Sequence, residues 1–151
     1  MAQDPIRIHP PLLGGALLLA TLQQQHFLPG LRGFHRPHHF LGALFVIAGV
    51  TAMMPAVALF ANHGTTKNPY GEPSTFISSP PYTVTRNPMY LGFVLVLLGA
   101  AIWIGSALML LAPVAFYWVI DQMVIPNEET TLKRLFGETY LEYQARVRRW
   151  I

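Results

Sequence analysis

The stretch PMYLGFVLVLLGAAIWIGSALMLLAPVAFYWVIDQMVIP, residues 88–126, decides the fold. A helix that spans a membrane needs about 20 consecutive apolar residues. This stretch is too long for one span and about right for two, and Gly105-Ser106 is the expected break between them. We therefore expect two membrane helices joined as a tight hairpin, with Trp103 at an interfacial position.

The composition agrees with a membrane protein. Hydrophobic residues make up 52% of the 151 residues and charged residues only 11%, whereas ordinary soluble domains are about 25% charged. A soluble helical bundle of this size would need more polar surface. The absence of cysteine excludes a disulfide framework, a thiolate nucleophile and a cysteine zinc site. The length fits one domain, 1–151.

Two more apolar segments precede this hairpin, residues 12–28 and 40–61. Together with residues 88–104 and 106–125 they predict an all-α integral membrane bundle of four transmembrane helices. The first segment is the weakest of the four because its outer end is polar. Pro55 is expected to kink the second segment.

Small residues lie on the second and third of these helices. Gly42 and Gly49 on one, with Gly92 and Gly99 on the other, offer faces for close helix packing. Glycine is also common in membrane helices generally. For each glycine taken alone, both interpretations stay open.

The chain becomes amphipathic after Pro126. Residues 128–150 carry apolar side chains at spacings of three and four, which is typical of one helix face, and charged residues on the other. We expect a C-terminal amphipathic helix that lies on the membrane surface or packs over the preceding polar loop. Gly137 is a candidate interruption of this helix.

The basic residues predict the topology. Eight of the ten lie on one side of a four-span arrangement: Arg7, Lys67, Arg86, Lys133, Arg134, Arg146, Arg148 and Arg149. The positive-inside rule then places both termini and the long loop in the cytoplasm, and we expect a bacterial inner membrane protein. Because the basic residues flank apolar segments, the net charge of +3 indicates contact with anionic lipid rather than nucleic acid.

The motif RNPMYLG, residues 86–92, stands where the third span begins. Asn87 is a favoured N-cap and Pro88 a favoured first helical residue, so plain capping explains both. A helix N-terminus also suits a ligand carboxylate, and Gly92 would let a flat group approach the backbone. Capping and ligand binding remain alternatives for this motif.

A pair of acids, Glu128-Glu129, follows the fourth span. These acids could simply occupy the first turn of a helix capped by Asn127. The hairpin, however, brings them to the same interface as RNPMYLG. Acids that face a basic helix start could hold a zwitterion, with its amine on the carboxylates and its carboxylate on the N–H groups.

RNPMYLG, the apolar hairpin and EETTLKRLFGETYLEYQARVRRW of residues 128–150 together resemble the isoprenylcysteine carboxyl methyltransferase and phospholipid methyltransferase family of integral membrane enzymes. The resemblance covers the second half of the chain, from His63 onward. It implies S-adenosylmethionine bound at the cytoplasmic membrane face, S-adenosylhomocysteine as product, and a lipophilic acceptor that enters from the bilayer. The acceptor atom, whether in a carboxylate, a thiol or an amine, stays open.

The resemblance also implies residue roles. The positions that match the cofactor pocket are Arg86, Asn87, Tyr90, Gly92, Glu128 and Glu129. Arg86 is the catalytic candidate: it would orient an anionic substrate, with a contact to lipid phosphate as the alternative. Most members have His where this chain has Asn87, so a proton role there is unsupported. Tyr90, Tyr140 or Tyr143 could face the sulfonium as a cation–π partner, although interface anchoring is favoured for each.

The loop before the motif must cover the same interface. His63, Thr66 and Asn68 are therefore candidate substrate contacts, with an ordinary connector as the alternative. We predict no metal site, because the histidines of HRPHH, residues 35–39, suit a polar turn. Asp121 is expected near the headgroups, paired with a basic residue such as Lys67. The rival to the enzyme is a non-enzymatic four-helix transporter or scaffold.

Overall fold

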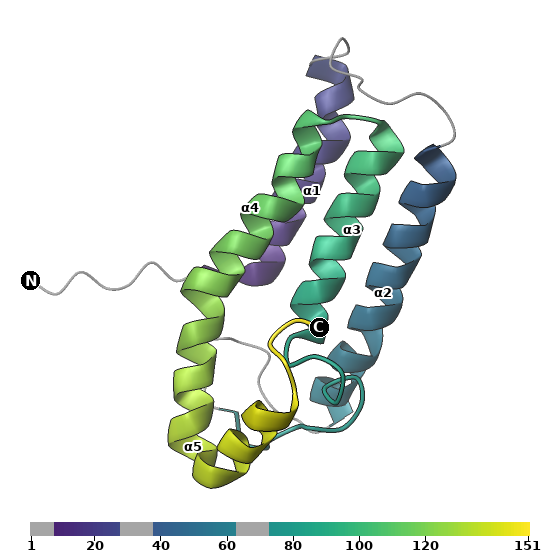
Figure 1. The fold of residues 1–151 in the computed structure, drawn as a ribbon. Coiled ribbons are helices and arrows are strands. Elements are labelled where there is room, and N and C mark those ends of the chain that lie inside the picture. The colour runs from purple at the N-terminus through teal and green to yellow at the C-terminus, as the bar shows by residue number, and fades with distance from the viewer. Residues whose placement is uncertain (1–7, 28–37, 63–72) are drawn as a thin grey trace, which may run out of the picture.

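A computed structural model describes residues 8–27, 38–62 and 73–151. Every regular element among these residues is helical: α1 (Pro10–Phe27), α2 (His38–Asn62), α3 (Pro88–Ile104), the short η2 (Leu108–Leu110), α4 (Leu111–Val119), the π-helical η3 (Ile120–Val124) and α5 (Ile125–Arg146). Helix α3 lies in the middle, with α2 on one side and α1 and α4 on the other (Figure 1). The predicted all-α class is confirmed.

Among the described residues, two helical stretches are long and apolar enough to cross a membrane: His38–Asn62, and the continuous rod Leu108–Arg146. Two further apolar helices, Pro10–Gln23 and Pro88–Ile104, are shorter. The count of four spans therefore stays a prediction.

Helices α2 and α3 meet along a seam of glycines seven residues apart. A Cβ added to Gly92 would lie 2.6 Å from the carbonyl oxygen of Gly49, and one added to Gly99 would lie 2.7 Å from that of Gly42. Real Cβ atoms do not approach this closely, so the two backbones touch where only glycine fits. Helix α2 fills the space beside Gly92 where a ligand was expected, which favours the packing interpretation of this glycine. Its cofactor role stays a prediction.

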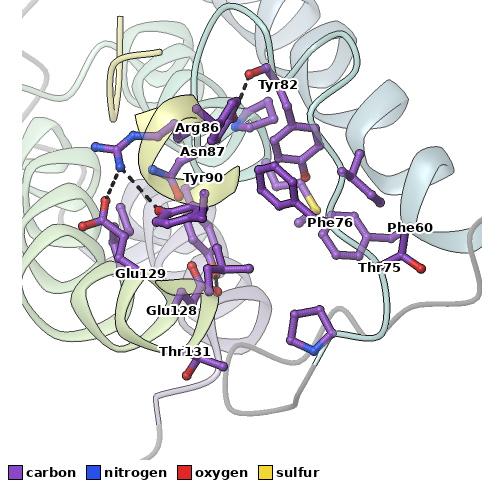
Figure 2. Close-up of a pocket in the computed structure, with 18 residues that line it drawn as sticks. Phe60, Thr75, Phe76, Tyr82, Arg86, Asn87, Tyr90, Glu128, Glu129 and Thr131 are labelled. Carbon is purple, nitrogen blue, oxygen red and sulfur yellow. Dashed lines mark hydrogen bonds and ion pairs between the residues drawn. The ribbon is translucent and has the colours of Figure 1, made fainter. Parts of the chain in front are cut away.

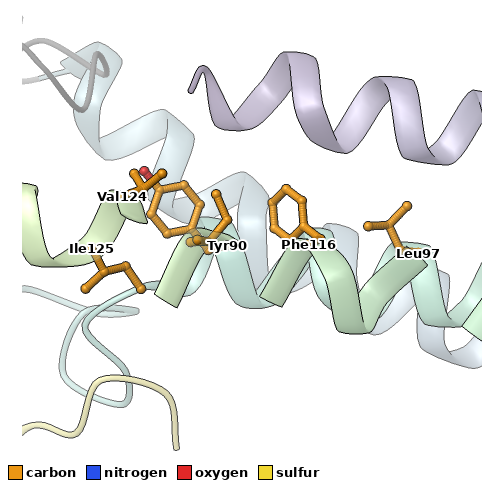
Figure 3. Packing of buried hydrophobic residues seen from close by; sticks show 6 residues of the cluster. Tyr90, Leu97, Phe116, Val124 and Ile125 are labelled. Atoms are coloured by element: carbon orange, nitrogen blue, oxygen red, sulfur yellow. The ribbon is translucent and has the colours of Figure 1, made fainter. Parts of the chain in front are cut away.

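The predicted break at Gly105-Ser106 is confirmed. Gly105 has φ 76°, a left-handed conformation that glycine adopts without strain, and its N–H bonds to the carbonyls of Ala101 and Ile102. The chain then turns into α4, so Leu97 of α3 and Phe116 of α4 join one buried cluster (Figure 3). Tyr90 and Ile125 extend this cluster toward the start of α3.

Helix α4 does not end at Pro126, as the sequence suggested. It continues through the π turn Ile120–Val124 into α5, with Pro126 inside the first turn of α5. Proline lacks an N–H and breaks the α-helical ladder, but the wider π turn just before it carries the chain past this point. The acid pair consequently projects from a continuous rod, and Asn127 does not cap a new helix.

The rod changes direction at Gly137, the candidate interruption. Its φ of 48° and ψ of −124° are not helical. The last turns therefore fold back toward the start of α3 (Figure 1), and Tyr140 and Tyr143 pack on Phe76 of the loop at ring distances of 5.9 and 5.2 Å. The part of α5 after Gly137 thus packs against the loop. The amphipathic interfacial helix stays a prediction.

Candidate active site

A pocket of about 120 Å³ opens at the end of the bundle where α3 begins, between the end of α2, the loop after residue 72 and α5. Charged and polar groups lie on one side of it, and aromatic side chains on the other (Figure 2). Its polar lining consists mainly of Arg86, Asn87, Tyr90, Glu128 and Glu129. Its apolar lining includes Phe60, Phe76, Ile77, Met89 and Leu132.

Glu129 lies between two arginines. Nη1 of Arg86 is 3.0 Å from one carboxylate oxygen, and Arg149 binds both oxygens, with Nε at 3.1 Å and Nη2 at 2.9 Å. The Glu129 and Arg86 side chains are only 11% exposed. Both oxygens of Glu129 are therefore held by guanidinium groups, which is a strong bidentate arrangement on the Arg149 side.

Glu128 has a different environment. One oxygen accepts a hydrogen bond of 2.6 Å from the Tyr90 hydroxyl, and no guanidinium contacts it among the residues that the structure describes. The residue lies beyond the apolar stretch that ends at Ile125. The pKa of the Glu128 carboxyl is raised from 4.5 to about 7. Burial is the main cause, the Tyr90 hydrogen bond lowers the pKa in part, and the nearby charge of Glu129 raises it. Glu128 is thus the acid whose charge is not yet compensated by a cation.

The extended segment after Arg146 closes this side of the site. The backbone N–H of Arg86 donates to the carbonyl of Arg148 at 3.0 Å. The side-chain amide of Asn87 donates to the carbonyl of Arg149 at 2.9 Å, and Thr85 donates to the same oxygen at 3.1 Å. Asn87 stands at the N-cap position, but its side chain makes no capping hydrogen bond. Its amide N–H instead donates to the C-terminal segment.

Asp121 pairs with a basic residue, although not with the one suggested from the sequence. Its carboxylate accepts from Nη1 of Arg149 at 3.2 Å and from the indole N–H of Trp150 at 2.8 Å. Lys67 lies outside the described residues. The π turn that carries Asp121 therefore helps to fix Arg149, and through Arg149 it helps to fix Glu129.

Two polar atoms of the pocket lining are buried without a hydrogen-bond partner among the described residues. They are Nε of Arg86 and the hydroxyl of Tyr82. Buried polar groups are nearly always paired in folded proteins, and unpaired ones point to a missing ligand or water. The two atoms belong to the charged and the aromatic side of the pocket respectively.

The structure brings most predicted site residues together and separates one. Gly92 is buried against α2 and is not part of the pocket lining. The predicted substrate contacts His63, Thr66 and Asn68 lie outside the described residues. The sequence reasoning missed Tyr82 and Arg149. Tyr82 lies outside the quoted motifs, and Arg149, in the stretch 128–150, was considered only as one of the basic residues that predict the topology. Only the fold brings the loop and the C-terminal segment to this pocket.

Residues 37–139 match the sequence model of the phospholipid methyltransferase family, which is more than half of the chain. The chain belongs to this family. The matched part includes the residues that line the pocket from Phe60 to the acid pair Glu128-Glu129, and it continues beyond that pair. This membership supports an enzyme over a transporter or scaffold.

Similar proteins carry related names. The chain is similar to protein-S-isoprenylcysteine O-methyltransferase B of Arabidopsis thaliana, 27% identical over 137 residues, which is 87% of this chain and 69% of that protein. It is similar to protein-S-isoprenylcysteine O-methyltransferase of Xenopus laevis, 30% identical over 111 residues, 71% of this chain but 38% of that protein. An uncharacterized protein of Haemophilus influenzae is 43% identical over 63 residues, 42% of this chain and all of that protein.

Proposed function

We propose that this phospholipid methyltransferase family member uses S-adenosylmethionine to methylate a lipophilic acceptor at the cytoplasmic face of a bacterial inner membrane. The observation that carries the proposal is the division of one pocket into a buried charged side and an aromatic side. The charged side suits a zwitterionic amino acid end. The aromatic side suits an apolar acceptor that arrives from the bilayer.

The residues present fit the zwitterion of the methyl donor. Glu128 would bind its ammonium group, because this acid is buried and, among the described residues, the Tyr90 hydroxyl is the one hydrogen-bond donor that contacts it. Arg86 would bind its carboxylate through Nε, which is buried and unpaired among the described residues. Glu129 would serve as the group that positions Arg86 rather than as an amine ligand, because two guanidiniums already hold it.

The cavity is smaller than the sites that usually bind small molecules. Small-molecule sites usually enclose about 300–1,000 Å³, whereas the pocket holds about 120 Å³. A nucleoside-sized ligand would therefore extend beyond the pocket or displace part of its lining. The loop side chains Phe76 and Ile77 are only half-buried and are better suited to move than the ion-paired Arg86.

When bound, the methyl donor supplies an electrophilic methyl group on a sulfonium. The protein then has to orient an acceptor in line with it and exclude water. A carboxylate or a thiolate needs no strong base, whereas an amine or a hydroxyl must lose a proton. Asn87 cannot accept that proton, since its side chain is a neutral amide that already donates to Arg149. With Glu128 assigned to the ammonium group and Glu129 to Arg86, neither carboxylate of the described lining is left to act as a base, so the proposed site favours acceptors that arrive as anions.

Ligand-induced thermal stabilisation tests this proposal. S-adenosylhomocysteine should raise the melting temperature of the detergent-purified protein in a concentration-dependent way, because it binds only the folded state. Transfer from labelled S-adenosylmethionine to a panel of lipophilic carboxylates, thiols and amines then identifies the acceptor. Failure of both S-adenosylhomocysteine and S-adenosylmethionine to stabilise the protein, with no transfer to any acceptor, would refute the function.

A further inference from the structure

Tyr82 is held firmly on the aromatic side of the pocket. The residue is only 7% exposed. Its ring meets Phe60 edge-on at 6.1 Å between centroids, and its backbone carbonyl accepts a hydrogen bond of 2.7 Å from the Tyr143 hydroxyl. Both the ring and the backbone of Tyr82 are therefore fixed by contacts that do not involve its own hydroxyl (Figure 2).

The hydroxyl itself is the unusual feature. It is buried in the lining of the pocket and has no hydrogen-bond partner among the described residues. A phenol can pack without strain as Phe does, so the hydroxyl adds nothing to the fold while its desolvation costs free energy. A buried donor of this kind is explained when a ligand in the pocket supplies the missing partner.

The surroundings indicate which ligand that is. Phe60, Phe76 and Ile77 line the pocket around the Tyr82 ring, and the groups that fit the zwitterionic cofactor stand on the opposite side (Figure 2). The Tyr82 hydroxyl is thus a polar atom in the part of the pocket that suits an apolar body. It marks the place where the polar head of a lipophilic acceptor would come to rest.

The protonation state of Tyr82 decides what it can bind. Burial, and then the carboxylate of Glu128, raise the pKa of the Tyr82 hydroxyl above its ordinary value, with a smaller contribution from Tyr143. The phenol therefore keeps its proton throughout the physiological range. A protonated phenol that lacks an acceptor on the described part of the protein is a hydrogen-bond donor, and its natural partner is an oxygen lone pair.

We propose that the Tyr82 hydroxyl donates a hydrogen bond to an oxygen of the acceptor's head group and so positions the acceptor for methyl transfer. This proposal rests on the proposed function. For a carboxylate, the bond would go to the oxygen that does not react. The other oxygen donates its electron pair to the methyl carbon, the carbon–sulfur bond breaks and its pair stays on sulfur. The carboxylate becomes a neutral ester and no proton moves.

Tyr82→Phe tests the proposal, because it removes only the unpaired hydroxyl. The probe is N-acetyl-S-farnesyl-L-cysteine, a lipophilic carboxylate, compared with N-acetyl-S-farnesylcysteamine, which lacks the carboxyl group. We expect a melting temperature that is unchanged or raised, because the desolvation cost of the hydroxyl is removed. The affinity for S-adenosylhomocysteine should be unchanged, and the KM for the carboxylate probe should rise about 10- to 100-fold, as for a lost hydrogen bond to a charged group. Inhibition by the cysteamine analogue should not change.

A matched control is Tyr117→Phe, the same chemical change at a half-exposed tyrosine that stacks on Trp150 outside the pocket. Its KM should equal that of the wild type. A lowered melting temperature for Tyr82→Phe would show that the hydroxyl has a structural partner. A weaker affinity for S-adenosylhomocysteine would assign it to the cofactor. Either result overturns the proposal, as does an unchanged KM.

The failure of the general function is separate from these outcomes. Wild-type protein that does not bind S-adenosylhomocysteine would refute the methyltransferase proposal itself. Wild-type protein that binds S-adenosylhomocysteine, yet neither methylates the carboxylate probe nor binds it in a thermal shift assay, would leave the cofactor site standing and overturn the role of Tyr82 toward an oxygen-bearing head group.

Discussion

Replacing Glu128 with glutamine should make the ligand-free protein more stable above neutral pH. The folded-state pKa of about 7 lies above the ordinary 4.5, so the contribution of this carboxyl to stability is fully present below pH 4.5 and is lost as pH rises to 7. The shift corresponds to about 3 kcal/mol. A glutamine side chain at this position cannot ionise, keeps a hydrogen bond to Tyr90, and avoids this loss.

The magnitude can be read from melting curves in detergent. For a chain of this length, 3 kcal/mol corresponds to about 6–12 °C. We expect Glu128→Gln to melt at about the wild-type temperature at pH 4.5. At pH 8 its melting temperature should exceed that of the wild type by up to about 6–12 °C. Among the described residues, the charged group that acts on the Glu128 carboxyl is Glu129. It is unchanged in the variant. Glu142→Gln, the same chemical change at an exposed position of α5, is the control and should leave the melting temperature at pH 8 unchanged.

Glu128→Gln should bind the cofactor more weakly than the wild type, although the variant itself is more stable. Binding of the ammonium group requires ionised Glu128, so the affinity of wild-type protein for S-adenosylhomocysteine should rise with pH through about 7 and then level off. The variant should bind about 2–5 kcal/mol more weakly and lose this pH dependence. Titration calorimetry at pH 6, 7 and 8 measures both. A variant that is less stable than wild type at pH 8, or that binds with unchanged affinity, would refute the reasoning.

The packing, the ion pairs and the topology each lead to one further prediction. Gly92→Ala should destabilise the protein by about 1–3 kcal/mol, because its Cβ would lie 2.6 Å from the Gly49 oxygen. The control Gly15→Ala, whose Cβ would have no atom within 4 Å, should be neutral or stabilising. Equal melting temperatures of the two variants would contradict the close contact between α2 and α3. Arg149→Met should cost about 1–3 kcal/mol, because it removes the Arg149 guanidinium from the carboxylates of Asp121 and Glu129; an unchanged melting temperature would show that these ion pairs do not contribute to stability. A reporter fused after Ile151 should lie in the cytoplasm, and a reporter inserted in the segment 32–39 should lie outside. Finding both reporters on the same side would contradict the four-span topology.

The helix bounds were predictable where the chain carries strong local signals. Asn87-Pro88 and Gly105-Ser106 mark the ends of α3 because proline and glycine act through their own backbones. The prediction of a helix end at Pro126 was wrong. Proline usually ends a helix, but the preceding π turn compensates for the hydrogen bond that Pro126 cannot make. Local rules fail where neighbouring turns compensate.

The site was predictable only as far as its motifs reach. RNPMY and the acid pair come together because the hairpin returns the chain to the same end of the bundle. The different roles of Glu128 and Glu129 could not be inferred, because they depend on Arg149, which arrives from a segment after the Gly137 kink. For Gly92, the shared spacing of seven with Gly99 and with the Gly42–Gly49 pair was a usable signal for packing.

The glycine seam between α2 and α3 has a consequence for the enzyme's response to its lipid environment. Backbones that interlock at Gly42, Gly49, Gly92 and Gly99 cannot slide past each other by a turn, because bulkier residues would then meet. In a bilayer that is thinner or thicker than its hydrophobic length, this pair must tilt as one body. Since α3 begins at the pocket, such a tilt would change the depth of the pocket in the bilayer. For the proposed lipophilic acceptor, we therefore expect the catalytic rate to depend on the acyl chain length of the surrounding lipids.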